Sequence, residues 1–117
     1  MKDDPNSEAT RPAPLQRFAP LPEARQLLAG KRYKEANALC RRMIEADPGC
    51  ADAFYVLGII SYEHHDFIRA LKFFEAAVQR GHPEPGPHVQ AARCFAQLGR
   101  PKQALAHIDA AMKLNPV

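Results

Sequence analysis

Apolar side chains recur through most of the chain at spacings of three and four residues, as in Phe74, Ala77 and Val78. This spacing places them on one face of an α-helix. From about Leu21 onward alanine is frequent, β-branched residues are scarce, and no Asn-Gly or Asp-Gly pair suggests a β-hairpin. The pattern predicts an all-α fold with about six helices, over residues 21–30, 33–46, 51–64, 67–80, 86–98 and 101–114.

Small residues recur with a period of thirty-four positions, at Ala24, Gly58 and Ala92. The same step separates two further sets, the small residues Ala36, Ala70 and Ala104 and the apolar residues Cys40, Phe74 and Ile108. Two helices can cross closely only where the side chains between them are small. The period therefore predicts repeated pairs of closely packed helices.

The repeated residues also form a recognisable motif. The middle unit reads Phe54-x-x-Leu57-Gly58 and then Ala70-x-x-x-Phe74, and the last unit ends with Asn115-Pro116. This pattern resembles the tetratricopeptide repeat family. The resemblance implies a right-handed superhelical array of three helix-turn-helix units, at about residues 17–50, 51–84 and 85–117. It also implies a protein-binding function.

The two proline-rich stretches suggest where the chain divides. Residues 1–20 hold four of the eleven prolines and few large apolar groups, which predicts a flexible N-terminal segment followed by a repeat domain over residues 21–117. The segment from Gly81 to Pro87 contains three further prolines, and it predicts a stiff, irregular hinge between the second and third units.

Composition narrows the classes of function. The chain has 117 residues, of which 46% are hydrophobic and 25% charged, and a net charge of +3 does not by itself indicate a nucleic-acid partner. The longest apolar run, from Ala53 to Ile60, is too short to cross a bilayer. Acidic residues near the N-terminus are atypical of a secretion signal. We therefore expect a cytoplasmic protein with no membrane association and no nucleic-acid partner.

Catalytic and metal-binding patterns are weak. Cys40 occupies a core position of the repeat, Cys94 is predicted to pack between helices, and Cys50 is predicted to lie in a turn. Glu63-His64-His65-Asp66 falls at a turn between helices, and the other histidines, at 82, 88 and 107, are scattered and predict no cluster. The chain has no phosphate-binding glycine loop. We expect no enzymatic activity, no metal and no cofactor.

A basic cluster lies in the first unit and could contact RNA or an acidic protein. It contains no aromatic stacking residue, and we interpret it as a solvated convex face formed by Lys31, Arg32, Lys34, Arg41 and Arg42.

The first helices of such units line a concave groove. Two tyrosines, an isoleucine and flanking arginines suit a peptide with apolar anchors and an acidic group. The alternative interpretation is that the tyrosines belong partly to the core. The predicted groove residues are Leu21, Arg25, Leu28, Tyr55, Ile59, Tyr62, Val89, Arg93 and Ala96.

Two subgroups of the family can be compared with this groove. Members that clamp the acidic tails of heat-shock chaperones carry lysine and asparagine on these helices, where this chain offers only Arg25, so tail clamping is not expected. The stretch from Glu84 to Gly99 is similar to the third repeat of bacterial type III secretion chaperones. That similarity implies, as an alternative function, a chaperone for an apolar client.

The last predicted helix is unusually apolar for the end of an array. End units normally carry a polar cap, whereas this helix presents Leu105, Ile108, Met112 and Leu114. We expect either that the natural chain continues, for example as the N-terminal scaffold of a longer enzyme such as a transferase, or that it self-associates through this helix.

Overall fold

The computed structural model describes residues 21–114, except for the side chain of Leu21. The predicted N-terminal segment, residues 1–20, and residues 115–117 lie outside this range. Within it the structure has six helices and no strand, which confirms the all-α fold. The predicted bounds agree with the observed ones to within one residue. The helices are α2 (Leu21–Ala29), α3 (Tyr33–Ala46), α4 (Ala51–Glu63), α5 (Phe67–Gln79), α6 (Gly86–Gln97) and α7 (Pro101–Leu114).

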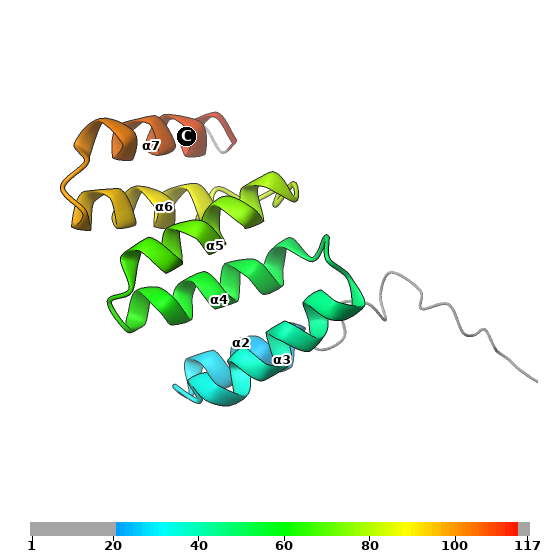
Figure 1. Ribbon diagram of the computed structural model, residues 1–117. Coiled ribbons are helices and arrows are strands. Elements are labelled where there is room, and N and C mark those ends of the chain that lie inside the picture. The colour runs from blue at the N-terminus through cyan, green and yellow to red at the C-terminus, as the bar shows by residue number, and fades with distance from the viewer. Residues whose placement is uncertain (1–20, 115–117) are drawn as a thin grey trace, which may run out of the picture.

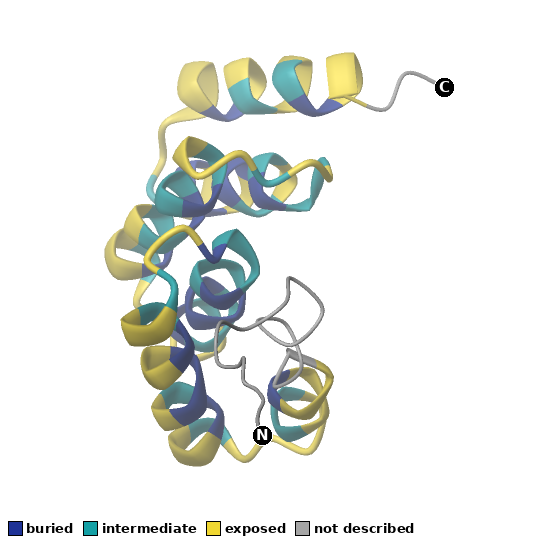
Figure 2. Ribbon diagram, turned by 90° about the vertical axis from the view of Figure 1, so that its right-hand side faces the viewer, coloured by how far each residue is buried: buried dark blue, intermediate teal, exposed yellow. Residues whose placement is uncertain are grey.

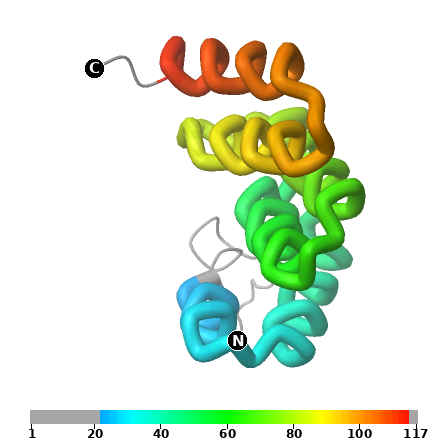
Figure 3. Tube along the Cα trace, turned by 90° about the vertical axis from the view of Figure 1, so that its left-hand side faces the viewer, coloured from blue at the N-terminus to red at the C-terminus, as the bar shows by residue number. Residues whose placement is uncertain are grey.

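The helices form three consecutive pairs, α2 with α3, α4 with α5, and α6 with α7, stacked in a curved array (Figure 1). The first helices of the pairs contact one another in succession, α2 with α4 and α4 with α6. In the view of Figure 3, α2, α4 and α6 lie toward the hollow side of the curve, and α3 and α5 lie on its outer side. The residues predicted to line a groove therefore belong to the inner helices.

The turn inside each pair repeats with the period of the sequence. Lys31, His65 and Gly99 lie thirty-four positions apart and have φ angles of 59°, 61° and 73°. After each of them, the backbone N–H of the next residue donates to a carbonyl five residues earlier, as from Asp66 to Ser61. This is the hydrogen-bond pattern of a helix that ends in a left-handed residue. The structure thus assigns His65 to this turn.

The buried residues run through the whole array between the inner and outer helices (Figure 2). The small periodic residues are all buried, and Phe74 is the largest fully buried side chain. Its ring lies so close to Gly58 that a Cβ atom there would be 2.5 Å from the ring. Glycine at this position therefore allows α4 and α5 to pack at the observed distance.

The proline-rich segment between α5 and α6 is anchored against the preceding repeat. The Arg80 guanidinium lies 4.1 Å from the centre of the Phe54 ring, and its Nε donates to the carbonyl of Pro48 at 2.8 Å. The side chain of His82 is only 4% exposed. These contacts fix where α6 begins relative to α4, which the proline pattern alone did not predict.

Candidate functional site

The central helix of the predicted groove, α4, carries Tyr55, Ile59 and Tyr62 at spacings of four and three residues. All three are half-buried and pack against a cluster on α5 and α6 that includes Phe74 and Cys94. The spacing therefore predicted correctly that they share one helix face. It did not predict how much of each side chain the neighbouring helices cover.

Tyr55 is enclosed by its neighbours. Its ring centre lies 5.8 Å from that of Phe74 and 5.4 Å from that of His82. A Cβ atom on Gly86 would lie 2.9 Å from the Tyr55 hydroxyl oxygen, so this tyrosine also contacts the first residue of α6. Tyr55 therefore holds the third repeat against the second, in line with the interpretation that the tyrosines belong partly to the core.

The Tyr62 ring lies between Phe67, whose ring centre is 5.2 Å away, and the third repeat. The guanidinium carbon of Arg93, on α6, lies 5.5 Å from the centre of the Tyr62 ring, a cation–π distance. Arg93 is exposed, and one turn earlier on the same helix Val89 is 42% exposed. Ala96, one turn later, is also exposed. The structure thus brings an aromatic ring, a cation and an exposed apolar side chain onto adjoining helices.

Arg25 lies at the other side of the groove and has a partner of its own. Its Nη2 lies 3.1 Å from Oδ1 of Asp52, at the start of α4. The same oxygen lies 2.8 Å from Nε2 of His82. Because His82 Nδ1 accepts the backbone N–H of Glu84, the Nε2 atom carries the proton and donates to the carboxylate. Asp52 therefore balances the charge of Arg25.

This Arg25–Asp52–His82 network links α2, α4 and the segment before α6, and only its arginine was predicted. Asp52 and His82 are thirty positions apart, and nothing in the periodicity pairs an acid with a histidine at that separation. Of the remaining predicted groove residues, Leu28 is half-buried against a cluster of buried side chains from α2, α3 and α4. The side chain of Leu21 lies outside the described residues.

Two of the histidines described as scattered in the sequence, His88 and His107, are in contact. The Nδ1 atoms of His88 and His107 lie 3.1 Å apart across the α6–α7 interface. Burial, and then the neighbouring His107, lower the pKa of His88. Periodicity places each histidine on its helix, but only the packing of α7 on α6 brings the rings together. In residues 21–114 no group of three or more histidine, cysteine or acidic side chains could hold a metal ion.

The cysteines are buried. Burial raises the pKa of the Cys40 thiol to about 11, with a further contribution from Cys50, and burial raises that of Cys94 to about 11. Both thiols are therefore protonated near neutral pH and are poor nucleophiles. Cys50 lies in the turn before α4 as predicted, but it is buried in the cluster formed by side chains of α2, α3 and α4 and does not face solvent.

The comparison with protein families agrees with the repeat geometry. The model described as "Anaphase-promoting complex, cyclosome, subunit 3" matches residues 29–111. The chain belongs to this tetratricopeptide family. The match covers helices from all three pairs, and the family resemblance seen in the repeat residues is confirmed. No curated protein with significant sequence similarity to the chain was found.

Solved structures of tetratricopeptide proteins have the same fold. YrrB, described as a tetratricopeptide protein with an unusual peptide-binding site, is 25% identical with a TM-score of 0.73, over 79% of this chain and 47% of YrrB. The type III secretion translocator chaperone SycD of Yersinia enterocolitica is 19% identical with a TM-score of 0.78, over 89% of this chain and 81% of SycD. An O-GlcNAc transferase of Thermobaculum terrenum is 19% identical with a TM-score of 0.78, over 86% of this chain and 19% of the transferase.

The chain therefore spans about half the length of YrrB. A tetratricopeptide array of this kind is in general a protein-interaction module. None of the described helices is long and apolar enough to cross a membrane.

Proposed function

We propose that this array is a non-catalytic interaction module that binds a peptide segment of a partner protein along α2, α4 and α6. The observation that carries the proposal is the surface formed by Tyr62, Arg93 and Val89, where a partly exposed ring lies beside an exposed cation and an exposed apolar side chain. Aromatic and arginine side chains are enriched at protein interfaces, and truncating such an anchor costs on the order of 2 kcal/mol or more of binding energy.

Charge further narrows the class of peptide. Arg25 is paired with Asp52, whereas no carboxylate of the described residues lies within ion-pair distance of Arg93. An acidic group of the peptide is therefore expected beside the third repeat, with an apolar side chain against Tyr62 and Val89. The similarity to YrrB, a peptide-binding tetratricopeptide protein, supports a peptide ligand.

Photo-crosslinking tests this surface directly. A benzophenone amino acid placed at Val89 should form a covalent adduct with a partner peptide bound in the groove. Arg93→Glu should reduce the yield of that adduct several-fold, because it reverses the charge that attracts the acidic group. The measurement is mass spectrometry of the adduct after a pull-down with the full chain.

The matched control places the same crosslinker at Ala38, an exposed residue of the outer helix α3. Adducts from Val89 that are absent from Ala38 support the groove. Adducts from Ala38 with none from Val89 would mean that the partner contacts the outer layer, and the proposal would be wrong.

The apolar face of α7 is a second binding surface, and we propose that it mediates self-association. Ile108 occupies the periodic position at which Cys40 and Phe74 are buried, yet it is 41% exposed, because no further helix covers it within the described residues. Three neighbours are also exposed, namely Leu105 at 61%, Met112 at 60% and Leu114 at 48%. An apolar stripe of this kind favours association with a second copy of the chain.

Light scattering during size-exclusion chromatography should accordingly find dimers at high concentration. The double variant Leu105→Glu, Met112→Glu should be monomeric, since two charges would be buried in the interface. The control Gln103→Glu, Ala106→Glu adds the same charge at two other exposed positions of α7 and should remain dimeric. A strictly monomeric wild-type chain would contradict the proposal.

A further inference from the structure

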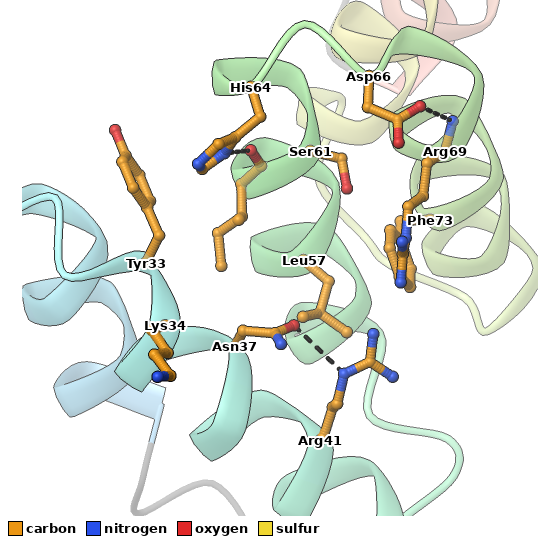
Figure 4. Close-up of a pocket in the computed structure, with 11 residues that line it drawn as sticks. Tyr33, Lys34, Asn37, Arg41, Leu57, Ser61, His64, Asp66, Arg69 and Phe73 are labelled. Atoms are coloured by element: carbon orange, nitrogen blue, oxygen red, sulfur yellow. Dashed lines mark hydrogen bonds between the residues drawn. The ribbon is translucent and has the colours of Figure 1, made fainter.

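A pocket of about 360 Å³ opens on the outer side of the array, between α3, α4 and α5 (Figure 4). Leu57 and Ser61 line it from α4, and His64 lines it from the residue that directly follows this helix. These residues follow Tyr55, Ile59 and Tyr62 by two positions each, which on an α-helix is a rotation of about 200°. The pocket and the proposed groove thus lie on opposite faces of the same helix.

The wall of the pocket is strongly cationic. Lys34 and Arg41 line it from α3 and Arg69 lines it from α5, while Asp66 is the only acidic residue in the lining. Within the described part of the chain none of the three cations forms an ion pair. The carboxylate of Asp66 accepts the backbone N–H of Arg69 at 3.2 Å, as the cap of α5. The pocket therefore has an excess of two positive charges.

Hydrogen-bond donors are also available there. Asn37 Oδ1 accepts from Arg41 Nε at 3.3 Å, which leaves the amide N–H groups of Asn37 and the terminal N–H groups of Arg41 free to donate. The Ser61 residue is only 8% exposed, and its hydroxyl has no hydrogen-bond partner among the described residues. Buried polar groups without a partner are uncommon, so this hydroxyl is a second indication of a ligand.

The rest of the lining combines two polar rings, of Tyr33 and His64, with apolar side chains. Leu57 and Ile60 contribute from α4 and Phe73 from α5, with the Arg69 guanidinium carbon 6.0 Å from the centre of the Phe73 ring. A ligand that fits this surface has an apolar body and a compact, doubly charged head with several acceptor atoms. A phosphoryl ester carries about 1.5 to 2 negative charges near pH 7 and three acceptor oxygens, whereas a carboxylate carries one charge and two oxygens.

We propose that this outer pocket binds a phosphoryl group carried on a side chain of a partner protein, so that phosphorylation of the partner controls a second contact with the array. This modifies the interpretation of the basic cluster as a solvated convex face. Its members Lys34 and Arg41 are exposed as expected, but they form one wall of a pocket whose other wall, Arg69, belongs to the next repeat.

The test is an NMR titration of the full chain with three small probes at constant ionic strength: phenyl phosphate, inorganic phosphate and benzoate. Phenyl phosphate should shift the backbone amide signals of Asn37 and Ser61. It should bind at least about ten-fold more tightly than benzoate, because the phosphate carries more negative charge and one more acceptor oxygen than a carboxylate. Inorganic phosphate should bind more weakly than phenyl phosphate, because it lacks the apolar body. Equal binding of the two phosphates would mean a site for the free ion, and the proposal of an esterified ligand would be overturned.

Matched variants separate a pocket from general charge attraction. Arg41→Gln with Arg69→Gln should weaken phenyl phosphate binding at least about ten-fold. Arg42→Gln with Arg100→Gln removes the same charge from exposed positions outside the pocket and should change binding less than about two-fold. Similar losses in the two double variants would overturn the proposal.

Ser61→Ala supplies a readout that does not depend on charge. Alanine favours the helix, so this variant should fold as the wild type does. It should bind phenyl phosphate several-fold more weakly, because a hydroxyl that donates to the ligand has been removed. Unchanged binding would exclude Ser61 from the site and overturn the proposed geometry.

Discussion

Replacing Phe74 by alanine should destabilise the array more than any other single truncation, by about 3–5 kcal/mol. Phe74 is fully buried, and its ring packs against Tyr55 and lies directly above Gly58. It belongs to the same cluster as Ala91 and Cys94 of α6, so the substitution would remove packing contacts of the third repeat as well as of the second. Urea denaturation followed by circular dichroism would measure the change in the free energy of unfolding.

Ile68→Ala provides the comparison for this experiment, since Ile68 lies on the same helix and is 60% exposed. It should change the free energy of unfolding by less than about 0.5 kcal/mol, as is usual for surface positions. A loss below about 1 kcal/mol for Phe74→Ala would show that α5 does not pack on α4 and α6 as described.

Gly58→Leu should have the second largest effect. A Cβ atom at this position would lie between 2.5 and 3.0 Å from three atoms of the Phe74 ring, and the cluster around that ring leaves it little room to move. Overpacking of this kind costs about 1–3 kcal/mol or more, while leucine recovers up to about 1 kcal/mol of helix propensity relative to glycine. We expect a net loss of about 1–2 kcal/mol, measured by the same denaturation experiment.

Gly49→Leu is the matched control, because the nearest atom to a Cβ there is the Asp47 carboxylate oxygen at 3.4 Å and the position is exposed. It should leave the unfolding midpoint nearly unchanged. In a double-mutant cycle, Phe74→Leu should relieve part of the cost of Gly58→Leu, because the two side chains compete for one space. Additive losses would contradict the proposed contact.

The groove residues show what the periodicity of the sequence could predict and what it could not. Spacings of four and three residues placed Tyr55, Ile59 and Tyr62 on one face of α4, as the structure has them. They did not distinguish Tyr55, which contacts Phe74, His82 and the start of α6, from Tyr62, whose ring lies beside the exposed Arg93. That difference arises because the segment between α5 and α6 places His82 and Gly86 against Tyr55.

Two of the contacts that the sequence did not reveal are between polar groups far apart along the chain. Asp52 with His82, and His88 with His107, meet only because neighbouring helices pack at a particular distance and rotation. The outer pocket was partly predictable from the sequence, because Lys34 and Arg41 are seven positions apart and therefore lie on one face of α3. The position of Arg69 opposite them required the packing of the second repeat.

The sequence by itself determined the helices and the repeat, because both depend on local properties of the chain. Apolar spacing defines each helix face, and small residues every thirty-four positions, such as Ala36 and Ala70, mark where two helices must cross closely. The tertiary structure alone decided that Asp52 neutralises Arg25, and that the Ser61 hydroxyl has no hydrogen-bond partner within residues 21–114. Electrostatic and hydrogen-bond energies depend steeply on distance and burial, and a one-dimensional pattern contains neither.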